Sequence, residues 1–358
     1  MNNKLNPGQT VGLIGVDFYT EELSGAFKAA GYRVKQLSPK DTSSKKLIDF
    51  AKQVDRLICA DFPEDPEDLD CVADQLIQDT LPFVMAQDRL LFKNFLDEAN
   101  INTQPYATIL SEEDVYENVK SIGFPCALRS NQGSDDLHLI YEASEIADAF
   151  AQLPPGPAIL EAWIPLDTEI ALTISRSISG HLHIVSLFEV VRIDTKAALY
   201  ITVPRIEAEW LEACEEVGRQ FVNELRGAGL FTLRLLMTST GVIYVHHVKC
   251  RPELNHYPKN MYGQSLPLLE QVSIFTDNQR LSASERQQQS VVILPIYKKQ
   301  VAKALELVSN HPQMNIQFYH DDWLQAEADE KVAEVSVVTE HITDMLSQMS
   351  STFFHESL

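Results

Sequence analysis

Basic residues are scarce in this chain, and their scarcity limits the partners that it binds. The 358 residues include 29 Lys and Arg against 51 Asp and Glu, which gives a formal net charge of -22. An electrostatic field of this sign repels duplex DNA and anionic lipid, so we expect neither nucleic acid nor membrane among the partners. A local basic pocket for a small anion is still compatible with the overall charge.

Paired cysteines and long apolar runs are also missing. No apolar run approaches the roughly 18 residues of a transmembrane helix, and the N-terminus lacks the apolar stretch of a signal peptide. The cysteines form no CxxC pair and are odd in number, which predicts single buried thiols in a reducing cytoplasm. They are Cys59, Cys71, Cys126, Cys214 and Cys250. We therefore expect a cytoplasmic protein.

The acidic residues are concentrated in two segments. Residues 61–79 hold eight acids without a Lys or Arg, and residues 321–358 hold nine acids and a single Lys. Neither segment has the loop of an EF-hand, with its glycine and terminal Glu. We therefore interpret both as solvated acidic faces.

The length and the order of the expected elements predict a multi-domain α/β protein. At roughly 100–200 residues per domain, the chain has two or three domains. Residues 11–16, 20–30 and 32–37 have the patterns of a strand, a helix and a strand, which is a βαβ unit and indicates an open α/β domain. Two more strands of this domain are expected at 56–59 and 82–85.

A strand-rich α+β region follows. Ser111 and Asp114 form a capping box for one of its helices. The helices are expected at 88–99, 111–122, 207–226 and 298–309. The strands are expected at 126–129, 137–141, 158–163, 169–176 and 182–191, with a hairpin formed by 230–237 and 242–248. A mixed tail ends the chain.

Eight short segments carry a resemblance to a known family. They are Gln87–Leu90 with Lys93, Phe95 and Leu96; Ile101–Pro105; Gly123–Arg129; Ile159–Glu169; Gly229–Phe231; Thr238–Val245; Arg251-Pro252; and His256-Tyr257. In this order they resemble the ATP-grasp family, and within it the ATPase subunit of phosphoribosylaminoimidazole carboxylase, also called N5-carboxyaminoimidazole ribonucleotide synthase. The resemblance covers about residues 10–280.

The resemblance implies a fold of mixed α/β and α+β class. An ATP-grasp fold is preceded by a Rossmann-like open α/β domain and followed by a small C-terminal subdomain. The expected boundaries are 1–103 for the Rossmann-like domain, 104–168 for the small lid subdomain, 169–280 for the central subdomain and 281–358 for the C-terminal subdomain.

The family condenses ATP, bicarbonate and aminoimidazole ribonucleotide. Bicarbonate attacks the γ-phosphate to give carboxyphosphate, and the carboxyl group then passes to the substrate amine. The resemblance thus implies ATP as the cofactor, a small-molecule nucleotide as the partner, and a homodimer. Such chemistry needs cations on the phosphates and a site closed to water.

The resemblance also assigns a set of residues to the nucleotide. Lys93 and Arg129 match two lysines that contact phosphate, with a surface charge and a structural ion pair as the respective alternatives. The hinge that meets adenine matches Glu161, Trp163 and Ile164, where Trp163 has a core position as its alternative. Glu169 matches the carboxylate that takes the ribose hydroxyls, with a solvated carboxylate as its alternative.

At the positions of the family's metal ligands the chain departs from the pattern. The two Mg²⁺-binding Glu positions on the hairpin hold Arg234 and His247, and the position of a catalytic arginine in the next loop keeps Arg251. A guanidinium cannot bind Mg²⁺, and imidazole is a poor ligand for it. We therefore expect no metal there. Two alternatives stay open for Arg234, which are direct binding of phosphate in place of the metal and a salt bridge in an unused site.

Three further anion-binding elements are altered. The loop at 130–137 has one glycine, no cation and the added pair Asp135 and Asp136, where the family has a Gly-rich loop over the phosphates. Asp17 lies at a helix N-terminus where it opposes a phosphate. The family's basic C-terminal segment is replaced at 320–336 by an acidic one.

Two functional hypotheses follow from different classes of protein. The first is a purine-biosynthesis ligase homologue that binds a nucleotide but has weak or lost catalysis. The second is a regulatory or interaction protein without catalysis on an ATP-grasp scaffold.

Overall fold

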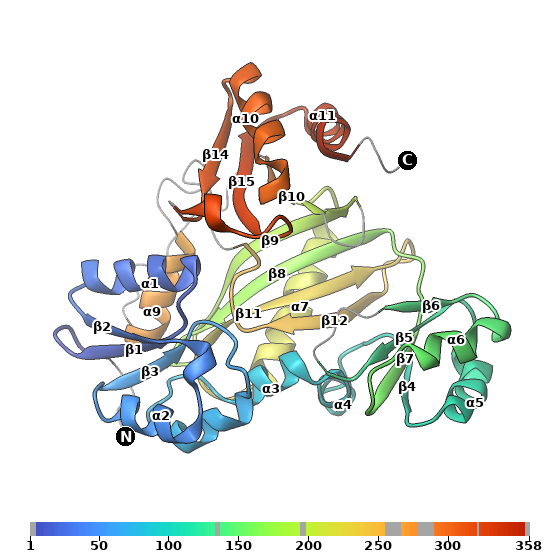
Figure 1. Cartoon of the computed structure of the whole chain (residues 1–358), viewed down its shortest axis with the longest axis horizontal. Coiled ribbons are helices and arrows are strands. Elements are labelled where there is room, and N and C mark those ends of the chain that lie inside the picture. Colours follow the sequence, from blue (N-terminus) through green and yellow to red (C-terminus); the bar gives the residue numbers. More distant parts are fainter. Residues whose placement is uncertain are drawn as a thin grey trace.

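The computed structural model describes residues 5–132, 137–193, 198–254, 266–277, 290–320 and 322–354. Their strands form three sheets, and the largest of these occupies the centre of the molecule (Figure 1). The sheet of the N-terminal residues lies on one side of it and a four-stranded sheet lies on the other. Within the described ranges, every helix is too short or too polar to cross a lipid bilayer.

The N-terminal residues form the expected open α/β unit. Its three strands are parallel in the order β2-β1-β3. Gly12 in the central strand is required by close packing, because a Cβ there would lie 2.8 Å from Leu57 and 2.9 Å from Phe50. The unit consists of β1 (Thr10–Ile14), α1 (Phe18–Ala29), β2 (Arg33–Leu37), α2 (Ser44–Ala51) and β3 (Arg56–Cys59). The predicted βαβ unit is therefore confirmed.

The strand predicted at 82–85 is wrong, because these residues lie in the helix α3 (Leu81–Gln87). Pro82 stands in the first turn of this helix, where its missing N–H costs nothing. A run of four apolar residues does not distinguish a buried strand from a buried helical turn. The next helix, α4 (Arg89–Glu98), starts at Asp88, whose carboxylate accepts a hydrogen bond of 2.8 Å from the backbone N–H of Leu91.

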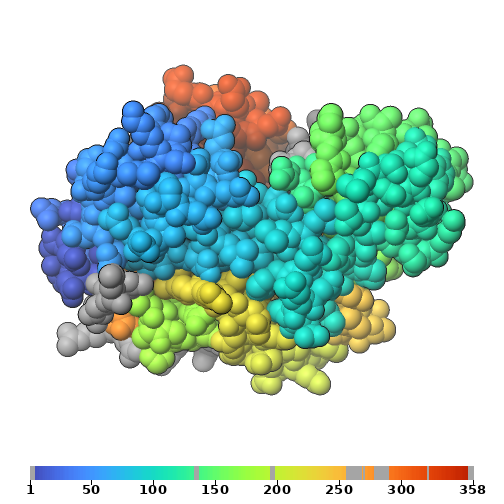
Figure 2. Space-filling model, turned by 90° about the horizontal axis from the view of Figure 1, so that it is seen from below, coloured from blue at the N-terminus to red at the C-terminus, as the bar shows by residue number. Residues whose placement is uncertain are grey.

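The four-stranded sheet forms a lobe of its own. Its antiparallel order is β4-β7-β5-β6, and two helices cover it. Seen from below, this lobe projects beside the N-terminal residues (Figure 2). Its elements are β4 (Tyr106–Ile109), α5 (Glu112–Ile122), β5 (Cys126–Ser130), β6 (His138–Ile140), α6 (Ile146–Ala151) and β7 (Ala158–Ala162). The predicted capping box of Ser111 and Asp114 is confirmed at the start of α5.

The central sheet has eight strands in the order β12-β11-β8-β9-β10-β13-β15-β14. Its strands are β8 (Thr168–Arg176), β9 (Leu182–Arg192), β10 (Ala198–Thr202), β11 (Gly229–Met237), β12 (Ile243–Lys249), β13 (Val291–Tyr297), β14 (Met314–Phe318) and β15 (Lys331–Val338). The sequence predicted no strand at β13, and β14 and β15 belong to the mixed tail after residue 309, for which it predicted no elements. Because β13 pairs with β10, the sheet is continuous from the central to the C-terminal residues.

Four longer helices and several 3-10 turns complete the described part of the chain. The longer helices are α7 (Ala208–Glu224), α9 (Leu266–Thr276), α10 (Val301–Asn310) and α11 (Ile342–Phe354). The 3-10 turns are Pro39–Asp41, Pro66–Val72, Ala143–Glu145, Lys298–Gln300 and Trp323–Gln325. The helix predicted at 207–226 corresponds to α7, and the helix predicted at 298–309 corresponds to the 3-10 turn Lys298–Gln300 followed by α10.

The alternation of β8 separates a core face from a polar face. Ile170, Leu172 and Ile174 pack into the main core together with residues of α7. Side chains of successive residues point to opposite faces of a sheet, so Glu169 and Thr173 lie on the other face. This polar face carries the site described below.

All five cysteines are free, and four of them are buried. The expectation of buried thiols is wrong for Cys71, which is exposed. It lies in the 3-10 turn Pro66–Val72, whose charged neighbours face solvent, and the pattern of cysteines in a sequence does not report on burial.

Candidate functional site

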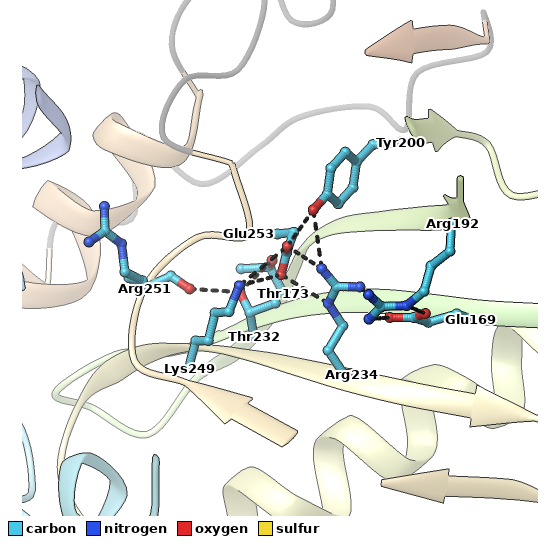
Figure 3. A network of polar contacts seen from close by, with 9 residues as sticks. All are labelled: Glu169, Thr173, Arg192, Tyr200, Thr232, Arg234, Lys249, Arg251 and Glu253. Atoms are coloured by element: carbon cyan, nitrogen blue, oxygen red, sulfur yellow. Dashed lines mark hydrogen bonds and ion pairs between the residues drawn. The ribbon is translucent and has the colours of Figure 1, made fainter. Parts of the chain in front are cut away.

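Arg234 lies at the centre of a polar network on the open face of the central sheet (Figure 3). Its neighbours on β11, Leu233 and Leu235, point into the main core, so the Arg234 side chain points the other way. Only 9% of its surface is exposed. A charge buried to this degree needs partners, because an unpaired buried ion is strongly destabilising.

Two carboxylates and a phenol supply those partners. The guanidinium of Arg234 donates Nη1–H to Oε1 of Glu169, Nη2–H to Oε1 of Glu253, and Nε–H to Oε2 of Glu253 at 3.2 Å. It also donates Nη2–H to the hydroxyl of Tyr200 at 3.2 Å, and that hydroxyl donates to Oε1 of Glu253 at 2.9 Å. The fork of the guanidinium is thus filled on both sides.

Two more cations surround the same carboxylates. Arg192 donates from Nε to Oε2 of Glu169 at 2.6 Å and from Nη2 to Oε1 at 2.9 Å. Lys249 lies 3.3 Å from Oε2 and 3.4 Å from Oε1 of Glu253. Every carboxylate oxygen of the network therefore faces a cation. The three cations outnumber the two carboxylates, which leaves the network with one net positive charge.

The loop after β12 positions Glu253. The hydroxyl of Thr232 on β11 donates to the backbone carbonyl of Arg251 at 2.7 Å, which fixes the start of the loop against the sheet. Burial alone would raise the pKa of Glu253, but the positive charges of Lys249 and Arg234 outweigh it and hold that pKa at about 2. Burial would likewise lower the pKa of Arg234, yet Glu253 and its other partners raise it well above the ordinary value. Both groups are charged at neutral pH.

The residues of the hairpin do not fit Mg²⁺. Arg234 on β11 pairs directly with His247 on β12, so a guanidinium and an imidazole stand where the ion would need carboxylate oxygens. Burial, together with nearby Lys249, lowers the pKa of His247 to about 3, which makes its imidazole neutral. Within the part of the chain that the structure describes, no three His, Cys, Asp or Glu side chains are grouped so as to hold a metal ion.

A β-bulge changes the expected arrangement of the two histidines. Strict alternation predicts that His246 and His247 point to opposite faces. The pairing shifts here, since Arg234 lies opposite His247 while Leu235 lies opposite Val245. His246 is the extra residue of the bulge, so the alternation rule does not apply to it.

Lys93 belongs to a second buried network, between α4 and the four-stranded sheet. Its ammonium lies 2.7 Å from Oε1 of Glu161 and 2.8 Å from the hydroxyl of Thr103, and the residue is only 1% exposed. Arg129 approaches the other oxygen of Glu161 at 3.7 Å. Burial would raise the pKa of Glu161, but the charges of Lys93, His246 and Arg129 hold it at about 2. Lys93 is thus buried in an ion pair and is not the surface charge that the sequence left open, whereas its contact with a phosphate stays a prediction.

The hinge after β7 exposes an aromatic ring. The backbone N–H of Trp163 donates to the carbonyl of Pro125 at 3.1 Å, which ties the hinge to the strand β5. The Trp163 residue is 39% exposed, so it is not plain core. Ile164 beside it is partly buried. An exposed ring at a hinge between two sheets provides a flat apolar surface for a base.

Arg251 joins the loop after β12 to the N-terminal unit. Its guanidinium lies 2.7 Å from Oδ2 of Asp17 and 3.1 Å from Oδ1 of Asp61. Asp17 also caps α1, where Oδ1 accepts from the backbone N–H of Thr20 at 3.0 Å. The carboxylate of Asp17 thus satisfies the helix N-terminus and pairs with Arg251, and the expectation that it opposes a phosphate there stays a prediction.

A cavity of about 220 Å³ adjoins both Glu253 and Arg251. Its walls combine three cationic residues and two phenol rings from the central and C-terminal residues, and Phe62 adds an apolar wall from the N-terminal residues. The five cationic and phenol residues are Lys249, Arg251, Lys331, Tyr200 and Tyr319. The composition of the walls suits a small anion.

Some predicted elements fall outside the described residues. They are residues 133–136 of the altered loop, which include Asp135 and Asp136, the pair His256-Tyr257, and Asp321 at the start of the acidic tail. Four residues of the network were in turn missed by the sequence interpretation. Arg192, Tyr200 and Lys249 carry no motif, whereas Glu253 follows the matched Arg251-Pro252 directly and its position could have drawn attention to it.

Comparison with known proteins identifies the same fold. The ATP-grasp domain matches residues 94–255. N5-carboxyaminoimidazole ribonucleotide synthase of Staphylococcus saprophyticus is 21% identical over 382 aligned positions, which cover 98% of each chain. Among solved structures, N5-carboxyaminoimidazole synthetase of Staphylococcus aureus superposes with a TM-score of 0.86 at 17% identity and covers 99% of this chain and 100% of its own. The Aspergillus clavatus synthase, in complex with ADP and 5-aminoimidazole ribonucleotide, gives 0.82 at 14% and covers 96% and 97%.

Proposed function

We propose that this chain binds an adenine nucleotide and has weak or no ligase activity. The proposal is supported by the match to the ATP-grasp domain and by the similarity to N5-carboxyaminoimidazole ribonucleotide synthases. The nucleotide would lie between the four-stranded lobe and the polar face of the central sheet. The exposed ring of Trp163 at the hinge supports a base site there.

The ion pairs of Arg234 carry the second half of the proposal. A synthase of this type must stabilise charge on a phosphate that is being transferred, and donors or metal ions aimed at that charge supply most of the rate enhancement. Here the metal position holds a guanidinium whose donors are filled by Glu169 and Glu253. Glu169, which the family resemblance gives to the ribose, has both oxygens occupied by cations. The residues at the positions that the resemblance assigns to the metal and to the ribose thus bind each other in one internal network.

Binding and turnover are tested separately. Calorimetric titration with ATP is expected to give a measurable dissociation constant. With ATP and Mg²⁺ present, we expect the rate of ADP release to be the same with and without bicarbonate and aminoimidazole ribonucleotide. Robust ADP release that needs all three additions would overturn the proposal of weak or lost catalysis.

A non-catalytic regulatory or interaction protein is the second candidate. The network around Arg234 favours this candidate. The buried ion pair of Lys93 with Glu161 also favours it, because the family resemblance assigns Lys93 to a phosphate. Under this alternative the titration with ATP gives no heat beyond dilution. The one measurement therefore separates the two candidates.

The remaining parts of the proposal concern the setting of the protein. We infer a homodimer in the cytoplasm from the family resemblance and from the free cysteines. Sedimentation equilibrium tests the dimer, and a monomer at all concentrations would contradict it.

A further inference from the structure

The charge arrangement around Arg234 is the reverse of a divalent-cation site. Such a site holds carboxylates around an ion that enters from solution. Here the carboxylates of Glu169 and Glu253 surround a cation that belongs to the chain itself. We infer that the guanidinium of Arg234 takes the place of the divalent cation, so that this chain binds the nucleotide polyphosphate without a metal. This inference rests on the proposed nucleotide binding and specifies the form of the nucleotide that is bound.

The occupied oxygens are the first reason that a divalent ion is excluded. Mg²⁺ takes carboxylate oxygens at about 2.0–2.1 Å and in near-octahedral order. Each oxygen of Glu169 and Glu253 already accepts from Arg234, Arg192 or Lys249. An entering ion would have to break these charge-assisted bonds and approach a buried guanidinium at short range.

The charge balance is the second reason. Two carboxylates with one divalent ion are neutral, whereas the network of three cations and two carboxylates is already positive without any ion. Arg234 cannot release its proton to accommodate a metal, since its partners raise its pKa further above the ordinary value. A second cation would therefore be repelled, and a polyphosphate would be attracted.

The exposure of the three cations assigns them different tasks. The side chain of Arg234 is 11% exposed and serves the carboxylates, whereas that of Lys249 is 32% exposed and that of Arg192 is 53% exposed. The two outer cations have surface left for phosphate oxygens. Lys249 also lines the cavity beside the network. The buried guanidinium holds the charge, and the outer cations present it to the ligand.

The experiment measures ATP binding by calorimetry in excess Mg²⁺ and in EDTA. For the wild type we expect dissociation constants that agree within about threefold, less than the tenfold that corresponds to 1.4 kcal/mol. Arg234→Glu places a third carboxylate in the network and reverses its charge, so we expect Mg²⁺ to tighten ATP binding to this variant by about tenfold or more. A wild type that binds ATP only with Mg²⁺ overturns the inference.

Direct titration with Mn²⁺, followed by electron paramagnetic resonance without nucleotide, makes the test independent of the proposed function. We expect no Mn²⁺ bound to the wild type and one Mn²⁺ bound to Arg234→Glu. If ATP does not bind in either buffer, the proposed function fails, and the Mn²⁺ titration alone decides whether Arg234 excludes the ion. Mn²⁺ bound equally to both proteins refutes the exclusion.

Two further variants guard against misfolding and general charge effects. Arg234→Gln removes the positive charge of residue 234 without introducing a negative one. If circular dichroism shows that Arg234→Glu does not fold, Arg234→Gln is used in both titrations instead. Arg219→Met is the matched control, because it also removes an arginine from a buried carboxylate, that of Glu215 at 3.0 Å, but on α7 at the core face of the sheet. It is expected to match the wild type in both buffers, and a gain of Mn²⁺ binding by this control would contradict the assignment to Arg234.

Discussion

Replacement of Arg234 by methionine removes the central cation of the network, and we expect the free energy of unfolding to fall by about 3 kcal/mol. Removal of one partner from a buried pair costs roughly 3–5 kcal/mol, because the other charge is left buried without compensation. The remaining partners of the two carboxylates limit the loss here. Glu169 keeps both hydrogen bonds from Arg192, and Glu253 keeps Lys249 at 3.3 Å and the hydroxyl of Tyr200 at 2.9 Å.

The lowered pKa of Glu253 gives a free energy of the same order of magnitude as the loss expected for Arg234→Met. Its pKa is lowered from 4.5 to about 2, and each unit corresponds to 1.36 kcal/mol, so its partners stabilise the ionised form by about 3 kcal/mol. Because the pKa is lower in the folded state, this stabilisation is present above pH 4.5 and is lost as the pH falls toward 2. In Arg234→Met the decrease in stability over this pH range should therefore be smaller.

The assay is a double-mutant cycle in urea that combines Arg234→Met with Glu253→Gln. The double variant should be more stable than the sum of the single losses predicts, with a coupling of about 1 kcal/mol or more. Arg219→Met, which breaks a partly exposed pair on α7, should cost less than about 1 kcal/mol. A loss below about 1 kcal/mol for Arg234→Met, or additive losses in the cycle, would refute the buried ion-pair network.

Three more predictions concern other parts of the molecule. Lys93→Met should lower the free energy of unfolding by about 3 kcal/mol in urea, because the buried carboxylate of Glu161 loses its nearest cation and keeps Arg129 at 3.7 Å, and an unchanged stability would contradict the structural ion pair. Gly241→Ala should melt at a lower temperature than Gly180→Ala, since both glycines have positive φ (82° and 85°) but only at 241 would a Cβ collide with Trp210, at 1.4 Å. Glu334→Gln should flatten the pH dependence of thermal unfolding, because burial raises the pKa of Glu334 from 4.5 to about 8. The wild type thus loses stability as the pH rises through this range, and an equal slope in the variant would count against it.

Those elements that depend on local order could be predicted from the sequence. The βαβ unit, the capping box at Ser111 and the hairpin of β11 and β12 follow from periodicity and from residues close together in the chain, whose interactions depend little on the rest of the fold. The strand expected at 82–85 is wrong because a short apolar run has no period that distinguishes a strand from a helix. The ATP-grasp resemblance rested on the order of segments, which needs no coordinates.

Which charges meet depends on the three-dimensional fold and could not be predicted from the sequence. Arg234 is 65 residues from Glu169 and 19 from Glu253, and no local pattern connects residues on different strands and loops. The sequence excluded a metal-binding carboxylate at this position and left phosphate and salt bridge as the alternatives. The pairing of β8 with β11 and the loop after β12 bring two carboxylates to the guanidinium, because a buried charge is stable only where the fold supplies its counter-ions.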